Sequence, residues 1–201
     1  MRIKLTDLAV LAGVAVAGGI AGAPRPGRSG PDRSLGGILA RLRSSGLEGR
    51  ELADAAIAAV NEGFPQHSVW HLWESPETAL ANGRGWSHQY NAILAQVLRA
   101  LGFEVRRVHA ARVRGWRHPW FYSSHSWVKV NLEGRWLDAC ASRSTNRLGE
   151  VGFVPVSEEL AYRRSTPYTV GLGLIPFITF GVWRAWLTGR DVAPWIYRRR
   201  D

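Results

Sequence analysis

A stripe of apolar residues at helical spacing lies between positions 90 and 101. Its members are Tyr90, Ile93, Leu94, Val97, Leu98 and Leu101. They follow the i, i+3, i+4, i+7 pattern of a helix with one buried face, and the next residue, Gly102, is typical of a helix end. The pattern therefore predicts an amphipathic helix that begins just after the turn-forming residues 83–86.

Strand-like segments follow this helix. They cover Phe103–Val113, Ser126–Leu132 and Arg135–Ala139, and Glu133-Gly134 separates the last two. Upstream, residues 35–60 are rich in Ala and Leu at helical spacing, and 75–77 resemble a helix start. Helices followed by an antiparallel meander predict an α+β fold.

Two uncharged apolar runs flank this part of the chain, Leu8–Ala23 and Tyr168–Val182. Each is either membrane-associated, the first as a signal or anchor, or a segment docked on the core. The first alternative predicts a membrane-associated or exported protein, and the second is compatible with the cytoplasm. We divide the chain into a hydrophobic segment and linker (1–33), a core (34–166) and an Arg-flanked hydrophobic extension (167–201).

Composition excludes several classes of protein. The 201 residues suit one domain, and the net charge of +10 comes almost entirely from arginine. No nucleic-acid-binding motif accompanies the charge, so no nucleic acid is expected. One cysteine, Cys140, rules out an intrachain disulfide. His67 and His71 have the spacing of two metal ligands on a helix, with Glu74 nearby, but without a third ligand we expect no metal and no cofactor.

Ser87 lies where the glycine-containing turn meets the predicted helix. Free N–H groups and the helix dipole favour negative charge at that point, as a nucleophile and its oxyanion require. Serine is also a preferred N-cap residue, so a purely structural role is the alternative.

His125 and Asp138 are candidates for a general base and the acid that orients it. If residues 131–134 form a four-residue loop, Asp138 lies opposite Trp127 and diagonal to His125 on one sheet face. A two-residue turn at Glu133-Gly134 keeps the face but moves Asp138 one pair farther away. The alternative is a strand histidine and a turn aspartate without contact.

Three segments in the same order resemble the transglutaminase-like, or papain-like, proteins. They are Gly83-Arg84-Gly85-Trp86-Ser87-His88-Gln89-Tyr90-Asn91 leading to Leu98-Arg99-Ala100-Leu101-Gly102-Phe103, His125-Ser126-Trp127-Val128-Lys129-Val130, and Trp136-Leu137-Asp138-Ala139. Residues 84–91 are also similar to the box of arylamine N-acetyltransferases, with Gln89 in place of Glu. The resemblance implies a nucleophile helix packed on an antiparallel sheet, and a triad of Ser87, His125 and Asp138.

Both families have a cysteine where this chain has Ser87. Three explanations stay open: a working Ser–His–Asp hydrolase, a silent descendant used for binding, or a cysteine-to-serine replacement. The resemblance implies acyl transfer or amide hydrolysis of a peptide, amide or acyl substrate, and the Arg-rich chain favours an acidic one. The residues expected along the oxyanion site and substrate cleft are Trp86, His88, Gln89 and Trp127. The alternative function is an inactive binding module at a membrane surface.

Overall fold

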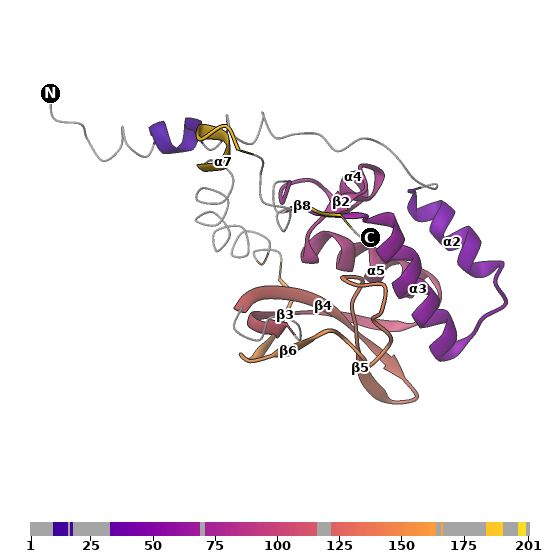
Figure 1. Ribbon diagram of the computed structural model, residues 1–201. Helices are drawn as coiled ribbons and strands as arrows, with labels where there is room; N and C mark the ends of the chain where they lie inside the picture. Colours follow the sequence, from indigo (N-terminus) through magenta and orange to yellow (C-terminus); the bar gives the residue numbers. More distant parts are fainter. Residues whose placement is uncertain are drawn as a thin grey trace, which may run out of the picture.

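A computed structural model of the chain describes residues 10–15, 17, 33–68, 71–115, 122–163, 166, 184–190 and 197–199. Within these ranges helices lie on one side of an antiparallel sheet (Figure 1), which confirms the α+β class. The apolar run 168–182, the loop 116–121 and most of 8–23 fall outside the described residues. In the described ranges, no helix has the length and apolar character needed to cross a membrane.

Residues 10–15 are helical. The other helices are α2 (Leu35–Arg43), α3 (Gly49–Gly63), α4 (Pro76–Ala81), α5 (Ser87–Ala100) and the short α7 (Arg184–Leu187). Ser34 and Ser75 cap α2 and α4, each accepting from a backbone N–H three residues on, at 3.0 and 3.1 Å. Helix α5 is the one predicted from the apolar stripe. It stops before Gly102, whose φ of 91° is readily adopted only by glycine.

The main sheet contains β3 (Glu104–Gly115), β4 (Tyr122–Leu132), β5 (Arg135–Ala139), β6 (Phe153–Pro155) and β7 (Glu159–Ala161). Its order is β5-β4-β3-β6, and β7 also pairs with β3. A second, small sheet contains β1 (Gln66–Ser68), β2 (Arg84–Gly85) and β8 (Tyr197–Arg199). Strand β4 begins earlier than the predicted Ser126, so His125 lies within the strand rather than at its start.

The turn between β4 and β5 has two residues, the shorter of the two lengths considered. Glu133 and Gly134 have φ angles of 53° and 79°, the combination of a type I′ hairpin turn. Asp138 consequently pairs with Lys129, and not with Trp127 as a four-residue loop would require.

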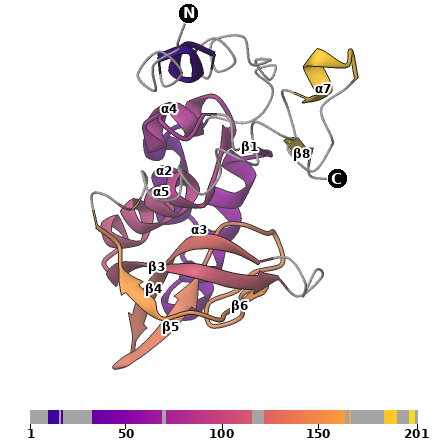
Figure 2. The ribbon, with the colours of Figure 1, turned by 90° about the vertical axis from the view of Figure 1, so that its left-hand side faces the viewer.

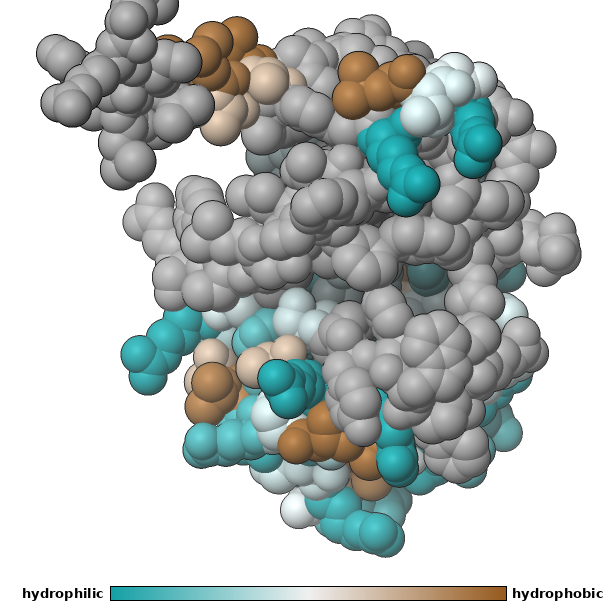
Figure 3. Space-filling view, turned by 60° about the vertical axis from the view of Figure 1, so that its left-hand side comes forward, coloured by the Kyte–Doolittle hydropathy of each residue, from teal (hydrophilic) through white to brown (hydrophobic). Residues whose placement is uncertain are grey.

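Helix α5 forms the centre of the core. It packs on β3 and β4, and α2, α3 and α4 pack against it (Figure 2). Its Ile93 and Leu94, like Val128 and Val130 of β4, are completely buried. Val154, Val156 and Leu160, in or next to the short strands β6 and β7, are exposed. Figure 3 shows hydrophobic side chains lying beside hydrophilic ones on one face of the molecule. The helix that carries the candidate nucleophile is thus the most buried one described.

Candidate functional site

Ser87 is the first residue of α5, and the residue in the N-cap position is Trp86. The Ser87 side chain is completely buried, and its Oγ has no hydrogen-bond partner among the described residues. A serine that caps a helix would accept a hydrogen bond from a backbone N–H of the first turn. The capping role considered for Ser87 is therefore wrong, and its hydroxyl is left without a local structural partner.

Gln89 fills the structural role at the start of α5. Its Oε1 accepts from Trp86 N at 2.8 Å, and its Nε2 donates to the carbonyls of His71 and Glu74 at 2.8 and 3.0 Å. These bonds occupy the polar atoms that the sequence suggested for an oxyanion site. A Cβ at Gly85 would lie 2.9 Å from the Phe64 ring, so the chain can pass here only with glycine.

His125 contacts the one cysteine of the chain. Its Nε2 lies 3.3 Å from Cys140 Sγ, which is completely buried just after β5. The imidazole also packs edge-on against Phe153, with ring centroids 4.6 Å apart. Burial, the neighbouring His109 and the charge of Arg143 lower the pKa of His125 to about 3. The imidazole is therefore neutral at pH 7, the protonation state that a general base needs, but a pKa this far below 7 makes it a weak base.

Asp138 does not hydrogen-bond to His125. Its Oδ1 accepts from Trp127 Nε1 at 2.8 Å and lies 2.9 Å from Lys129 Nζ, which also pairs with Glu159 at 2.9 Å. The two-residue turn causes this, because it brings Lys129 rather than Trp127 opposite Asp138. Asp138 is thus bonded to the Trp127 indole, whose ring lies nearly parallel to that of His125, with ring centroids 6.2 Å apart.

Asn91, which belongs to the segment that resembles the two families but was given no role of its own, joins these groups. It lies one turn after Ser87 on the same side of α5. Its Nδ2 donates to Ser126 O at 2.7 Å and to Cys140 Sγ at 3.3 Å, and its Oδ1 accepts from Ala141 N at 3.0 Å. The available signal was a polar residue three positions before Leu94 and seven before Leu98, on the apolar side of the helix.

His88 is buried and lies apart from the His125 contacts. Its Nε2 lies 2.9 Å from Leu72 O, to which it donates, and its Nδ1 has no partner within the described chain. Burial lowers the pKa of His88 to about 4, although the bond to Leu72 opposes the shift. Arg107 binds the His88 carbonyl at 2.9 Å, so this histidine belongs to the interface of α5 with β3.

His67 and His71 do not share a helix: His67 lies in β1 and His71 in a turn, so the helical metal pair is wrong. Nowhere in the described part of the chain do three His, Cys, Asp or Glu residues form a group that could hold a metal.

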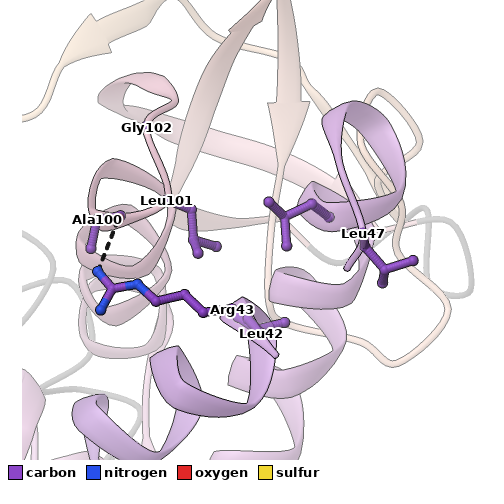
Figure 4. Close-up of a pocket in the computed structure, with 7 residues that line it drawn as sticks. Leu42, Arg43, Leu47, Ala100, Leu101 and Gly102 are labelled. Carbon is purple, nitrogen blue, oxygen red and sulfur yellow. Dashed lines mark hydrogen bonds between the residues drawn. The ribbon is translucent and has the colours of Figure 1, made fainter. Parts of the chain in front are cut away.

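The pocket in Figure 4 lies where α2 and α3 meet the C-terminal end of α5, with Arg43 donating to Ala100 O at 3.2 Å. It is at the other end of α5 from Ser87, about 20 Å away.

Comparisons with known proteins give little further information. No family model matches the chain, and no curated protein matches its sequence. A crystal structure of a TGase superposes with a TM-score of 0.42 and 8% identity over 73% of this chain. The match spans 35% of that chain. A likeness at this level does not assign the chain to a family.

Proposed function

We propose that the chain is an acyltransferase or amide hydrolase in which Ser87 is the nucleophile and His125 the general base. The observation that carries this proposal is the completely buried Ser87 hydroxyl, which has no hydrogen-bond partner among the described residues. Leaving such a group unsatisfied costs about 1–3 kcal/mol. A native structure that retains one therefore calls for an explanation, and a reacting substrate as partner is one.

The position of Asn91 relates the hydroxyl to the imidazole. Ser87 and Asn91 are four residues apart in α5, and Asn91 reaches Cys140, which contacts His125. The hydroxyl thus faces the region where α5 meets β4 and the end of β5. No hydrogen bond joins Ser87 to His125 in the described structure. Catalytic hydrogen bonds commonly form only in the substrate complex, so the mechanism requires closure of this gap on binding.

The reaction would follow the usual order of acyl transfer. Ser87 Oγ attacks the substrate carbonyl carbon while His125 takes its proton, and the first N–H groups of α5 stabilise the oxyanion. The amine leaves with the proton from His125, and an ester to Ser87 remains. Water or an amine then attacks this ester and restores the hydroxyl. Because serine is far less acidic than a thiol, the proton must be removed in concert with attack.

Labelling of the nucleophile tests this proposal. The chain is treated with a fluorophosphonate, and a Ser87→Cys variant with iodoacetamide, and the modified residue is located by mass spectrometry. We expect the fluorophosphonate on Ser87 and a fast reaction of the thiol introduced at position 87, both abolished by His125→Ala. Ser75→Cys supplies the matched control, because Ser75 is an exposed residue at the start of another helix, α4.

Each result has a distinct meaning. Reaction of the variant alone would indicate a site built for a thiol, in which Ser87 marks a silent or altered enzyme. Reactivity at position 87 no greater than at position 75 would contradict the nucleophile proposal. The binding module at a membrane surface would then be the better hypothesis, and loss of His125 should leave its ligand affinity unchanged.

A further inference from the structure

Cys140 occupies the position that the orienting acid of the triad was expected to hold. The last residue pair between β4 and β5 is Val128 with Ala139, so the next residue, Cys140, comes opposite Trp127 and diagonal to His125. The contact of 3.3 Å between Cys140 Sγ and His125 Nε2 agrees with this register. One nitrogen of His125 therefore has the sulfur as its partner.

The neighbours of the sulfur determine which atom donates. Asn91 must present its NH₂ group to Sγ, because its Oδ1 already accepts from Ala141 N at 3.0 Å. The thiol hydrogen has an acceptor in Ser142 Oγ at 3.2 Å. Burial raises the pKa of the Cys140 thiol, although the bonds with Ser142 and Asn91 oppose the shift, so the thiol is protonated at neutral pH.

With its own hydrogen directed at Ser142, the sulfur is an acceptor toward His125 as it is toward Asn91. His125 Nε2 then carries the imidazole hydrogen, and Nδ1 keeps a free lone pair. Ser87 Oγ is completely buried, has no partner in the described part of the chain, and lies on the helix face that Asn91 shares, so it is the hydroxyl whose proton such a nitrogen could take.

We propose that Cys140, and not Asp138, is the positioning residue of His125: its sulfur accepts the Nε2 hydrogen and holds the tautomer whose Nδ1 is the base. This inference rests on the proposed function of Ser87 and His125. Asp138 is engaged elsewhere, with Trp127 and Lys129. A neutral thiol in this position orients the imidazole without adding the negative charge that a carboxylate would supply.

The absence of that charge has a measurable consequence. Among the described residues, His109, Arg143 and Cys140 are the titratable and charged groups that act on His125 or contact it, and none of these three lends it negative charge. An aspartate in place of Cys140 would put a carboxylate within reach of the imidazole, which typically raises a histidine pKa by about 1–3 units. Serine would keep a neutral acceptor, and alanine would remove the partner.

The test is ¹⁵N NMR of the histidine rings in the full chain, with His125→Gln used to assign the resonance. We expect the Nε2–H tautomer in the parent and in Cys140→Ser, a mixture of tautomers in Cys140→Ala, and a raised pKa in Cys140→Asp. Asp138→Asn is the matched control, because it removes the carboxylate without touching the sulfur and should leave the tautomer unchanged. Fluorophosphonate labelling of Ser87 should slow at least about tenfold in Cys140→Ala, a part of the ~10²–10⁴ that general-base catalysis contributes.

A parent-like tautomer in Cys140→Ala, or a tautomer that changes in Asp138→Asn instead, would overturn the inference. A Cys140→Ala variant that does not fold leaves the test to Cys140→Asp, in which an unchanged His125 pKa overturns it equally. Failure of the proposed function is a different result: Ser87 remains unlabelled in the parent while the NMR of His125 follows the expected pattern.

Discussion

Asn91 connects three parts of the structure through one side chain. Its amide binds the Ser126 carbonyl of β4, the Cys140 sulfur and the Ala141 N–H, and all three partners are buried. An amide that uses its donors and its acceptor in this way keeps α5 and the end of β5 in one relative position. The placement of Ser87 relative to His125 therefore depends on a residue with no expected chemical role.

Replacement of Asn91 should destabilise the fold strongly. Asn91→Leu keeps the approximate size but leaves several buried groups without partners, and we expect the free energy of unfolding to fall by about 2–4 kcal/mol. Urea unfolding measures this. Gln96→Leu is the control, because Gln96 lies in the same helix but binds the exposed Glu77, at 2.7 Å. This replacement should lower the free energy of unfolding by under about 1 kcal/mol. An equal loss of unfolding free energy in Asn91→Leu and Gln96→Leu would contradict the connecting role of Asn91.

His88 should make the protein less stable in acid. Its pKa is about 4 in the folded chain against 6.5 for an ordinary histidine, so the unfolded chain binds more protons as the pH falls from 6.5 toward 4. Through His88 alone, the free energy of unfolding should be about 2 kcal/mol lower at pH 5 than at pH 7.

The measurement is urea unfolding at pH 7 and pH 5 for the parent and for His88→Gln, whose amide can still donate to Leu72. We expect a smaller difference between the two pH values in the variant, while Gln96→Ala should retain the parent difference. A pH dependence that is the same in His88→Gln and the parent would mean that His88 is already protonated in the folded state at pH 5.

At the scale of elements, helix α5 shows which features a linear pattern can predict. The apolar stripe and Gly102 predicted the helix because burial on one face imposes a period of 3.6 residues. Strand β5 was predicted with its observed bounds, Arg135–Ala139. Strands β6 and β7 were not predicted, because three residues each are too few to show an alternation.

The site was predictable only in part, because its partners depend on register. Ser87 at the helix start and His125 in a strand followed from local patterns. The partner of His125 depended on whether the hairpin loop has two or four residues, which the positive φ of Glu133 and Gly134 decides. The bonds of Asp138 to Trp127 and Lys129 likewise arise from cross-strand and diagonal neighbours, which no local signal identifies.

The turn itself gives a prediction at this scale. Gly134 has a φ of 79°, so Gly134→Ala should lower the free energy of unfolding by about 1–2 kcal/mol. Gly36→Ala is the matched control, since Gly36 is exposed within α2 and an added Cβ meets no atom within 4 Å. That change should instead stabilise the protein by about 0.5–1 kcal/mol. Thermal unfolding of both variants measures the contrast, and a tolerated alanine at position 134 would argue against the type I′ turn.

At the scale of the whole molecule, helix α3 holds the loop that follows Cys140. Asn61 donates to the Ala141 carbonyl at 2.8 Å, just after the cysteine. Seven residues farther on, Arg50 donates to the Leu148 carbonyl and Asp54 accepts from its N–H, each at 2.6 Å. Helix α3 and this loop are almost a hundred residues apart in sequence. The position of Cys140 and of the loop after it therefore depends on a helix near the start of the core.

Loss of the Asp54 contact should therefore loosen the loop without unfolding the sheet. In Asp54→Ala, the completely buried Leu148 loses the partner of its N–H, and we expect a cost of about 1–3 kcal/mol in unfolding free energy. Amide hydrogen exchange should accelerate across residues 141–152 while β3 and β4 stay protected, because local opening requires less free energy than global unfolding. Glu62→Ala is the control from the same helix: its 3.5 Å ion pair with Arg41 is exposed and should contribute under about 1 kcal/mol. Faster exchange in β4 as well would show that the loop and the sheet open as one unit, and that α3 stabilises the whole core rather than the Cys140 end of the site.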